Sequence, residues 1–150
     1  MSDREMAASK LTRKELIDLL HGEFPEMSNA MGNYDIEEVW CGGCRLRHPF
    51  SGNSLRPGGT LSGTTMMSLA DFAMYIAVLS AIGWVPLAVT TNLTINFLKK
   101  PAARDLVAEA RLIKLGKRLA VGEVGIRSDG DDDLVAHVIS TYSIPATGQR

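Results

Sequence analysis

The longest apolar run in the chain lies between residues 61 and 82 and reads LSGTTMMSLADFAMYIAVLSAI. Serine, glycine and two threonines open the run, and the chain that follows alternates between apolar and polar residues as strands do. A run of this length can cross a membrane as a helix. Because Asp71 lies in its middle, we instead expect a long helix buried within the protein, and no membrane partner.

Asp71 stands alone among the ionisable residues of this region. Between Arg56 and Lys99 there is no Lys, Arg, His or Glu, and Asp71 is the only Asp. A mid-helix aspartate costs about 0.5 kcal/mol in helix propensity, and an unpaired buried carboxylate costs several kcal/mol more. Asp71 is therefore a candidate for chemistry. The alternative is a carboxylate that caps or pairs internally and only fixes the helix.

The segments around this helix read as short strands and one further helix. In VTTNLTINFL, at Val89–Leu98, Leu93, Ile95 and Phe97 share one face. The other predicted strands are Tyr34–Cys41, Cys44–His48, Asp105–Leu115, Leu119–Arg127 and Leu134–Ile144. Gly42–Gly43 is predicted to form a two-residue hairpin turn, and Ser51–Gly59 a loop. At the start, Thr12 is predicted to cap an amphipathic helix over Arg13–His21.

Composition narrows the class of protein. The chain has 150 residues, a net charge of −1 and 22% charged residues, which fits one domain with a single core. Its Lys and Arg residues do not run beyond pairs, which argues against a nucleic-acid partner. The first twenty residues have acids among their bases and lack the apolar segment of a secretory signal, so we expect a cytoplasmic location.

Three further motifs favour structural interpretations. The CGGC sequence is expected to be a turn rather than a redox pair or half of a zinc site, because only two cysteines exist. Counted from Asp129, the sixth and twelfth positions of a calcium loop hold Leu134 and Ser140 instead of Gly and Glu, which favours a solvated turn. His137 lies in a strand pattern and is interpreted as structural. We expect no metal and no cofactor.

Three segments read SLRPGGTLSGTTMMSLADFA, VTTNLTINFLKKPA and AEARLIKLGKRLAVGEV. Together they resemble the PaaI-type acyl-CoA thioesterases of the hotdog fold. The resemblance implies an α+β hotdog domain, in which an antiparallel curved sheet wraps around one long central helix. We expect a single domain over residues 1–150, with a short N-terminal helix and lead-in over 1–33 and the hotdog core over 34–145.

That family's usual signature is N-x-x-G-x-x-H-G-G followed by L-A-D. Here Gly59, Gly63 and the Leu69-Ala70-Asp71 sequence are retained. Three positions depart from the signature, since Arg56 replaces Asn, Ser62 replaces His and Thr64 replaces the last Gly.

Thioester hydrolysis needs a group that attacks the carbonyl carbon and a group that holds the charge growing on its oxygen. Asp71 suits the first role, either by direct attack or by taking a proton from water. The backbone N–H of Gly63 suits the second, because it lies at the start of a helix and lacks a side chain. Eight residues of helix separate the two by about 12 Å, so the spacing predicts a site shared across a dimer. The resemblance implies the same arrangement, as a dimer or a dimer of dimers.

Other polar residues have open roles. Thr90, at the family's polar position early in the strand after the helix, positions the attacking water or is an ordinary strand residue. Arg56 binds an oxygen of the acyl group or pairs with Asp71. Ser62 and Thr64 donate hydrogen bonds near the thioester or cap the helix. Lys117 and Arg118, together with Lys99 and Lys100, meet the phosphates of coenzyme A or serve solubility.

We therefore expect a hydrolase of small or medium acyl-CoA thioesters, in which coenzyme A is part of the substrate. The alternative is a non-catalytic dimer that binds acyl-CoA or an acyl carrier. A hydratase is disfavoured, because that chemistry generally pairs an acid with a histidine. The Gly-rich loop, the central helix and the first strand after it contain no histidine.

Overall fold

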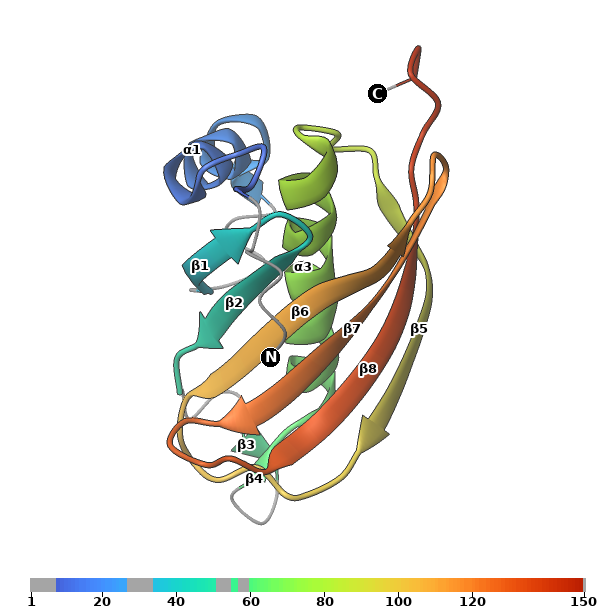
Figure 1. Ribbon diagram of the computed structural model, residues 1–150. Helices are drawn as coiled ribbons and strands as arrows, with labels where there is room; N and C mark the ends of the chain where they lie inside the picture. The colour runs from blue at the N-terminus through green and yellow to red at the C-terminus, as the bar shows by residue number, and fades with distance from the viewer. Residues whose placement is uncertain (1–7, 27–33, 51–54, 57–59, 150) are drawn as a thin grey trace.

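The computed structural model describes residues 8–26, 34–50, 55–56 and 60–149. Its elements are α1 (Arg13–Glu23), β1 (Asp35–Trp40), β2 (Gly43–His48), β3 (Leu55–Arg56), β4 (Thr60–Leu61), α3 (Gly63–Ile82), β5 (Val89–Phe97), β6 (Leu106–Leu115), β7 (Leu119–Ser128) and β8 (Leu134–Ser143). Six strands form one antiparallel sheet in the order β1-β2-β6-β7-β8-β5, which curves around α3 (Figure 1). The predicted hotdog architecture is confirmed.

α3 is the centre of the core. Nearly every residue from Leu69 to Ala81 is buried, and 72% of its most apolar 18-residue stretch lies inside the protein. By length and composition α3 can cross a membrane, but a helix so covered is the core helix expected from the sequence. The sheet supplies one wall of this core through Leu46, Leu106 and Ile126, which are fully buried. Burial of such side chains stabilises the fold by roughly 1.5–3 kcal/mol each.

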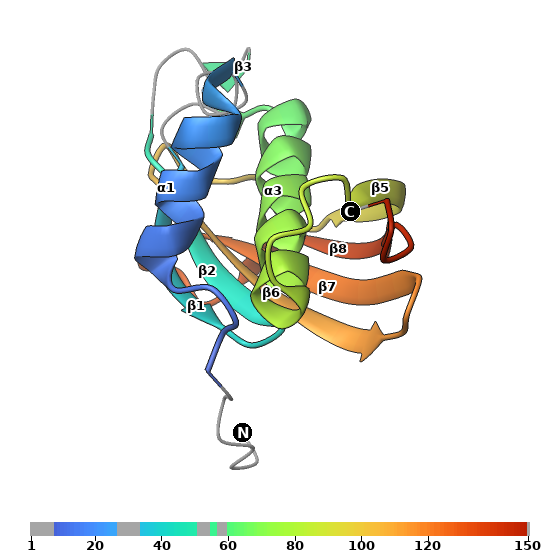
Figure 2. The ribbon, with the colours of Figure 1, turned by 90° about the horizontal axis from the view of Figure 1, so that it is seen from above.

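α1 lies beside α3 on the same side of the sheet (Figure 2). Thr12 caps it as predicted, because its side chain accepts the N–H of Glu15 at 3.1 Å. Leu16 and Leu20 are its buried face. The predicted end at His21 is wrong by two residues, since the helix continues through Gly22 to Glu23.

The first hairpin turns one residue earlier than the sequence predicts. Trp40 pairs with Gly43, so the two turn residues are Cys41 and Gly42, and only Gly42 has a positive φ, at 79°. Gly43 is required for a steric reason instead, because a Cβ at this position would lie 2.1 Å from the indole Nε1 of Trp40. The CGGC sequence is a turn with two free cysteines, and Cys44 points inward, its thiol donating to the Ala73 carbonyl at 3.2 Å.

The predicted loop over Ser51–Gly59 lies only partly within the described residues. Its Leu55 and Arg56 form β3, which pairs with β4 as a short antiparallel ladder that sequence periodicity did not indicate. The other strand boundaries agree with the prediction within one or two residues.

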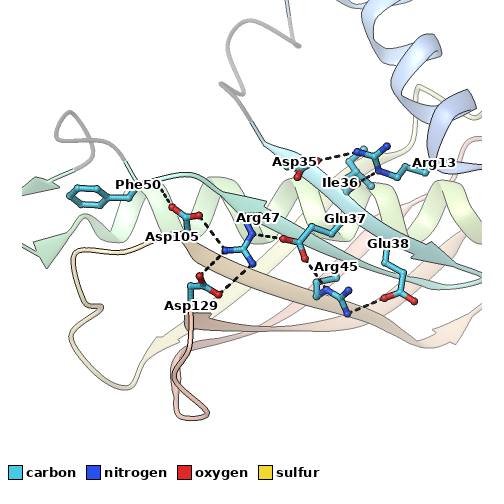
Figure 3. Close-up of polar contacts among 10 residues, drawn as sticks. All are labelled: Arg13, Asp35, Ile36, Glu37, Glu38, Arg45, Arg47, Phe50, Asp105 and Asp129. Atoms are coloured by element: carbon cyan, nitrogen blue, oxygen red, sulfur yellow. Dashed lines mark hydrogen bonds and ion pairs between the residues drawn. The ribbon is translucent and has the colours of Figure 1, made fainter.

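Arg47 of β2 joins four separate segments of the chain (Figure 3). Its guanidinium pairs with Glu37 of β1, with Asp105 before β6 at 3.2 Å, and with Asp129 after β7 at 3.1 Å. Asp105 also accepts the backbone N–H of Phe50 at 2.7 Å. The network thus fixes the end of β2, where the chain departs toward the start of α3.

Candidate active site

Asp71 is the ninth residue of α3 and lies at the end of its least buried stripe. Thr64, Met67 and Ser68 are the exposed residues of this stripe, and Asp71 is partly exposed. Asp71 is partly open to solvent and has partners on the sheet.

Two hydroxyl groups converge on one carboxylate oxygen. Thr90 donates from its Oγ1 to Oδ1 of Asp71 at 2.5 Å. The Tyr142 hydroxyl lies 3.1 Å from the same Oδ1 and 3.1 Å from the backbone carbonyl oxygen of Asp71. Neither hydrogen bond involves Oδ2. Hydrogen bonds to an ionised group are roughly twice as strong as those between neutral groups, so this cluster defines where the carboxylate lies.

The sheet brings these two donors together. Thr90 of β5 and Tyr142 of β8 are direct partners in the antiparallel ladder, so both side chains stand on the face that meets α3. A β-bulge follows at once, between Thr90 and Asn92. Bulges of this kind redirect the side chains of a strand and are frequent beside active sites.

The cluster opens onto a small recess with aromatic walls. Its volume is about 160 Å³. The residues that line it are Asp71, Phe72, Tyr75, Pro86, Ala88, Val89, Thr90 and Tyr142. Tyr75 and Tyr142 stack with ring centroids 6.2 Å apart, and the Tyr75 hydroxyl donates to the Pro86 carbonyl at 3.0 Å.

Both phenol groups stay protonated at neutral pH. Burial raises the pKa of Tyr75 to about 12. Burial, and after it the charge of Asp71, raises the pKa of Tyr142 further. Tyr142 can therefore act as a hydrogen-bond donor over the whole physiological range.

Gly63 is the first residue of α3, at the opposite end of the exposed stripe. Ser62 precedes it as the N-cap and accepts the N–H of Thr65 at 3.2 Å, which is the capping role considered from the sequence. A Cβ at Gly63 would lie 3.0 Å from Cζ of Phe97, so the Phe97 ring occupies the space that a side chain would need. The Gly63 amide belongs to the first turn and has no acceptor within the helix.

Gly63 and Asp71 lie on one straight element, eight residues apart. At 1.5 Å of rise per residue the separation is about 12 Å, so the two groups cannot contact the same carbonyl within one chain.

The remaining predicted residues are more scattered. Arg56 lies in β3 opposite Thr60, and its side chain and Gly59 fall outside the described residues. Lys117 and Arg118 are exposed in the turn before β7, and Arg118 donates from Nε to the Ile144 carbonyl at 2.9 Å. Leu119, directly after them, pairs with Ser143, which in turn pairs with Val89. This turn therefore lies at the same end of the sheet as Thr90 and Tyr142.

Other candidates are engaged elsewhere. Lys99 pairs with Asp131 at 2.8 Å and Asp133 at 3.4 Å, so it closes the acidic turn. His137 contacts Glu123 at 3.0 Å on the side of the sheet away from α3. Within the described parts of the chain, no cluster of three or more His, Cys, Asp or Glu side chains can hold a metal.

Sequence reasoning missed Tyr142. A two-residue period places it on the same face as Val138 and Ser140, which identifies an inward position and nothing more. The pairing of β8 with β5 brings it to Asp71, and no local pattern encodes that pairing.

A curved antiparallel sheet wrapped around one long central helix is the hotdog fold. Comparison with known proteins identifies the family within this fold class. Residues 58–135 match the family model of the thioesterase superfamily. One relative is a protein of Saccharolobus solfataricus whose name gives esterase as an inferred activity. It is 34% identical to this chain over 134 residues, which cover 89% of this chain and 86% of that protein. The chain belongs to the thioesterase superfamily.

Solved structures agree with this assignment. A protein of Silicibacter sp. TM1040, named as an inferred thioesterase, is 39% identical with a TM-score of 0.82, over 94% of this chain and 96% of that chain. The PaaI protein of E. coli, from the phenylacetic acid degradation operon, is 25% identical with a TM-score of 0.72, over 83% and 87% of the two chains. The resemblance to PaaI-type proteins is thus confirmed.

A third structure shows the fold alone. It is a hypothetical thioesterase from Streptococcus pneumoniae with coenzyme A, 21% identical with a TM-score of 0.74, over 84% of this chain and 97% of that chain. Taken together, the relatives indicate a hydrolase of esters or thioesters.

Proposed function

We propose that the protein hydrolyses the thioester bond of a small or medium acyl-CoA at a site shared by two copies of the chain. In this proposal Asp71 of one copy and the Gly63 amide of the other act on the same carbonyl. The observation that carries it is the Asp71 cluster, in which Oδ1 accepts from Thr90 and Tyr142 while neither bond involves Oδ2.

The chemistry has two forms, which share the same overall balance. In one, Asp71 takes a proton from water, the hydroxide attacks the carbonyl carbon, the C–S bond breaks and the thiolate regains the proton. In the other, the Asp71 carboxylate attacks the carbonyl carbon and the C–S bond breaks to release the thiolate. Water then hydrolyses the mixed anhydride, and the thiolate takes the proton that this step frees. In both, the Gly63 amide stabilises the oxyanion, and the products are the free acid and coenzyme A.

The surface supports a dimer. β5 is an edge strand, paired only with β8 among the described strands. Large apolar side chains are exposed on it and beside it: Met67, Leu87, Val89, Phe97 and Leu98 are 43–61% exposed. An edge strand with exposed apolar residues favours association with another chain. Two copies with antiparallel α3 helices bring Gly63 of one beside Asp71 of the other.

The choice of acyl-CoA rests on two observations. The Streptococcus pneumoniae protein that shares the fold was solved with coenzyme A. In this chain, Lys117 and Arg118 are exposed at the end of the sheet nearest Asp71, where they can meet phosphates.

Thiol release from a panel of acyl-CoA esters tests the reaction. The assay needs a background correction or Cys41→Ser, because Cys41 is an exposed free thiol. We expect Asp71→Asn to lower kcat by at least about 100-fold, since the attacking group is lost. Asp132→Asn, the same change in an exposed turn, serves as the control and keeps full activity. Binding of acyl-CoA without turnover by the wild type would instead support the non-catalytic alternative.

Complementation tests the shared site. Gly63→Pro removes the N–H at the first helical position, where the backbone accepts proline, and the extended Ser62, with ψ 151°, suits a following proline. The proline Cβ displaces the Phe97 ring, which can move because it is 52% exposed. Alone, Gly63→Pro and Asp71→Asn are expected to be inactive. After mixed refolding, half of the dimers hold one intact site of two, so about one quarter of wild-type activity returns. A site within one chain gives no recovery.

A further inference from the structure

Tyr142 occupies a position that no feature of the family signature assigns. Its ring is 3% exposed and stacks on Tyr75, and its hydroxyl is directed at Asp71. A buried phenol needs an acceptor, and here the acceptor belongs to the candidate catalytic carboxylate.

The hydroxyl has two acceptors at equal distance, with different consequences. A bond to the Asp71 carbonyl at 3.1 Å only ties β8 to α3. A bond to Oδ1, also at 3.1 Å, fixes the carboxylate itself. Thr90 donates to the same Oδ1 at 2.5 Å from the neighbouring strand, so two rigid strands hold a single oxygen.

This arrangement makes the two carboxylate oxygens unequal. Oδ1 accepts two hydrogen bonds, which stop the carboxylate from rotating. No hydrogen bond to Oδ2 is found among the described residues, although the Asp71 side chain lines the recess. With respect to the described part of the chain, Oδ2 is therefore the oxygen whose lone pairs accept no hydrogen bond.

We propose that Tyr142 is a positioning residue that, together with Thr90, holds Oδ1 of Asp71 and leaves Oδ2 as the atom that attacks the carbonyl or accepts the proton of water. This rests on the proposed thioesterase function. The buried phenol suits the task, because its ring is fixed by packing and its pKa is raised, so the donor persists at high pH.

Steady-state kinetics of Tyr142→Phe test the proposal, because the change removes the hydroxyl and keeps the stacked ring. We expect kcat to fall about tenfold with KM changed less than twofold, since substrate binding is not altered but the carboxylate is less well placed. Tyr34→Phe is the matched control, because Tyr34 is a partly buried phenol that is hydrogen-bonded to Ser68 outside the recess. It should leave both constants unchanged.

A double-mutant cycle identifies the oxygen that is held. Thr90→Val alone should resemble Tyr142→Phe, and the two combined should lose more than the product of the single losses, because Oδ1 then has no donor. If the loss of kcat in the double variant equals the product of the two single losses, Thr90 and Tyr142 do not act on the same oxygen. Thermal unfolding of each variant separates positioning from folding, since a purely structural tyrosine lowers Tm and leaves the kcat of folded protein unchanged.

The outcomes distinguish this inference from the proposed function. If Asp71→Asn is inactive and Tyr142→Phe retains kcat within twofold of wild type, only the role of Tyr142 is refuted. If Asp71→Asn retains full activity, the hydrolytic mechanism fails, and the role of Tyr142 fails with it.

Discussion

Gly122→Ala tests how closely the sheet and the central helix are packed. Gly122 is buried in β7, and Met74 of α3 lies against it. A Cβ built at Gly122 would lie 2.6 Å from Sδ and 2.7 Å from Cε of Met74, and 2.8 Å from the backbone oxygen of Arg111. The thioether is flexible and can move, but the Arg111 carbonyl belongs to the neighbouring strand β6 and cannot move without distorting the sheet.

The expected magnitude follows from two opposing effects. Overpacking of a filled core costs about 1–3 kcal/mol, and a glycine-to-alanine change at an unstrained position returns roughly 0.4–1 kcal/mol by restricting the unfolded chain. Gly122 has no positive φ, so the second effect applies in full. We expect a net loss of about 1–2 kcal/mol in the free energy of unfolding. At this chain length each kcal/mol lowers Tm by roughly 2–4 °C.

The same change should reach the active site. Met74 follows Asp71 by three residues on α3, so a helix pushed away from β7 also moves the carboxylate relative to Thr90 and Tyr142. A displacement near 1 Å can lower kcat by about 100-fold, and we expect a loss of tenfold or more. Guanidinium unfolding at fixed protein concentration measures stability, and thiol release measures kcat.

Gly125→Ala is the matched control on the same strand. Its Cβ would face the opposite side of the sheet and meet only the tip of Leu134, at 3.0 Å. A flexible, partly exposed side chain can yield, so stability should stay within about 0.5 kcal/mol of wild type. The packing argument is wrong if Gly122→Ala is as stable as wild type, or if Gly125→Ala is destabilised equally.

Three further predictions concern the ion network and the start of α3. Arg47→Met leaves Glu37 and Asp105 without their shared partner and should cost about 1–2 kcal/mol, because such partly exposed pairs contribute at most about 1 kcal/mol each; denaturant unfolding measures it. Burial raises the pKa of Glu37 but the hydrogen bonds from arginine outweigh it, while the Phe50 amide and then Arg47 lower the pKa of Asp105. The stability that these groups contribute is complete above their ordinary pKa values near 4 and is lost as the pH falls through the lowered values. The free energy of unfolding, measured from pH 5 to 3, should therefore decline in the wild type and decline less in Arg47→Met. An equal slope in both proteins would contradict the role of Arg47. Ser62→Ala removes the N-cap of α3 and should lower stability by about 1 kcal/mol in the same assay, whereas Ser62→Gly should lower it by only a few tenths.

Local patterns of the sequence determined the elements of this fold. The apolar run over residues 61–82 forms α3, and the alternating segments form strands, because side chains repeat every 3.6 residues in a helix and every 2 in a strand. Asp71 could be singled out for the same reason, since one carboxylate in an apolar helix conflicts with its surroundings. The retained Gly63 and LAD motif identified the family.

Errors arose where a contact that periodicity does not report decided the outcome. Gly43 pairs with Trp40 and lies against its indole, so the two turn residues are Cys41 and Gly42. Lys99 closes an acidic turn more than thirty residues away, so it is not a free cation.

The sequence by itself thus determined which segments form helix or strand and which acid is unusual. Only the tertiary structure decided that β5 lies beside β8, and with it that Thr90 and Tyr142 hold one oxygen of Asp71. The physical reason is that strand order and register depend on contacts between residues far apart in the chain, whereas periodicity reports only which face of an element is buried.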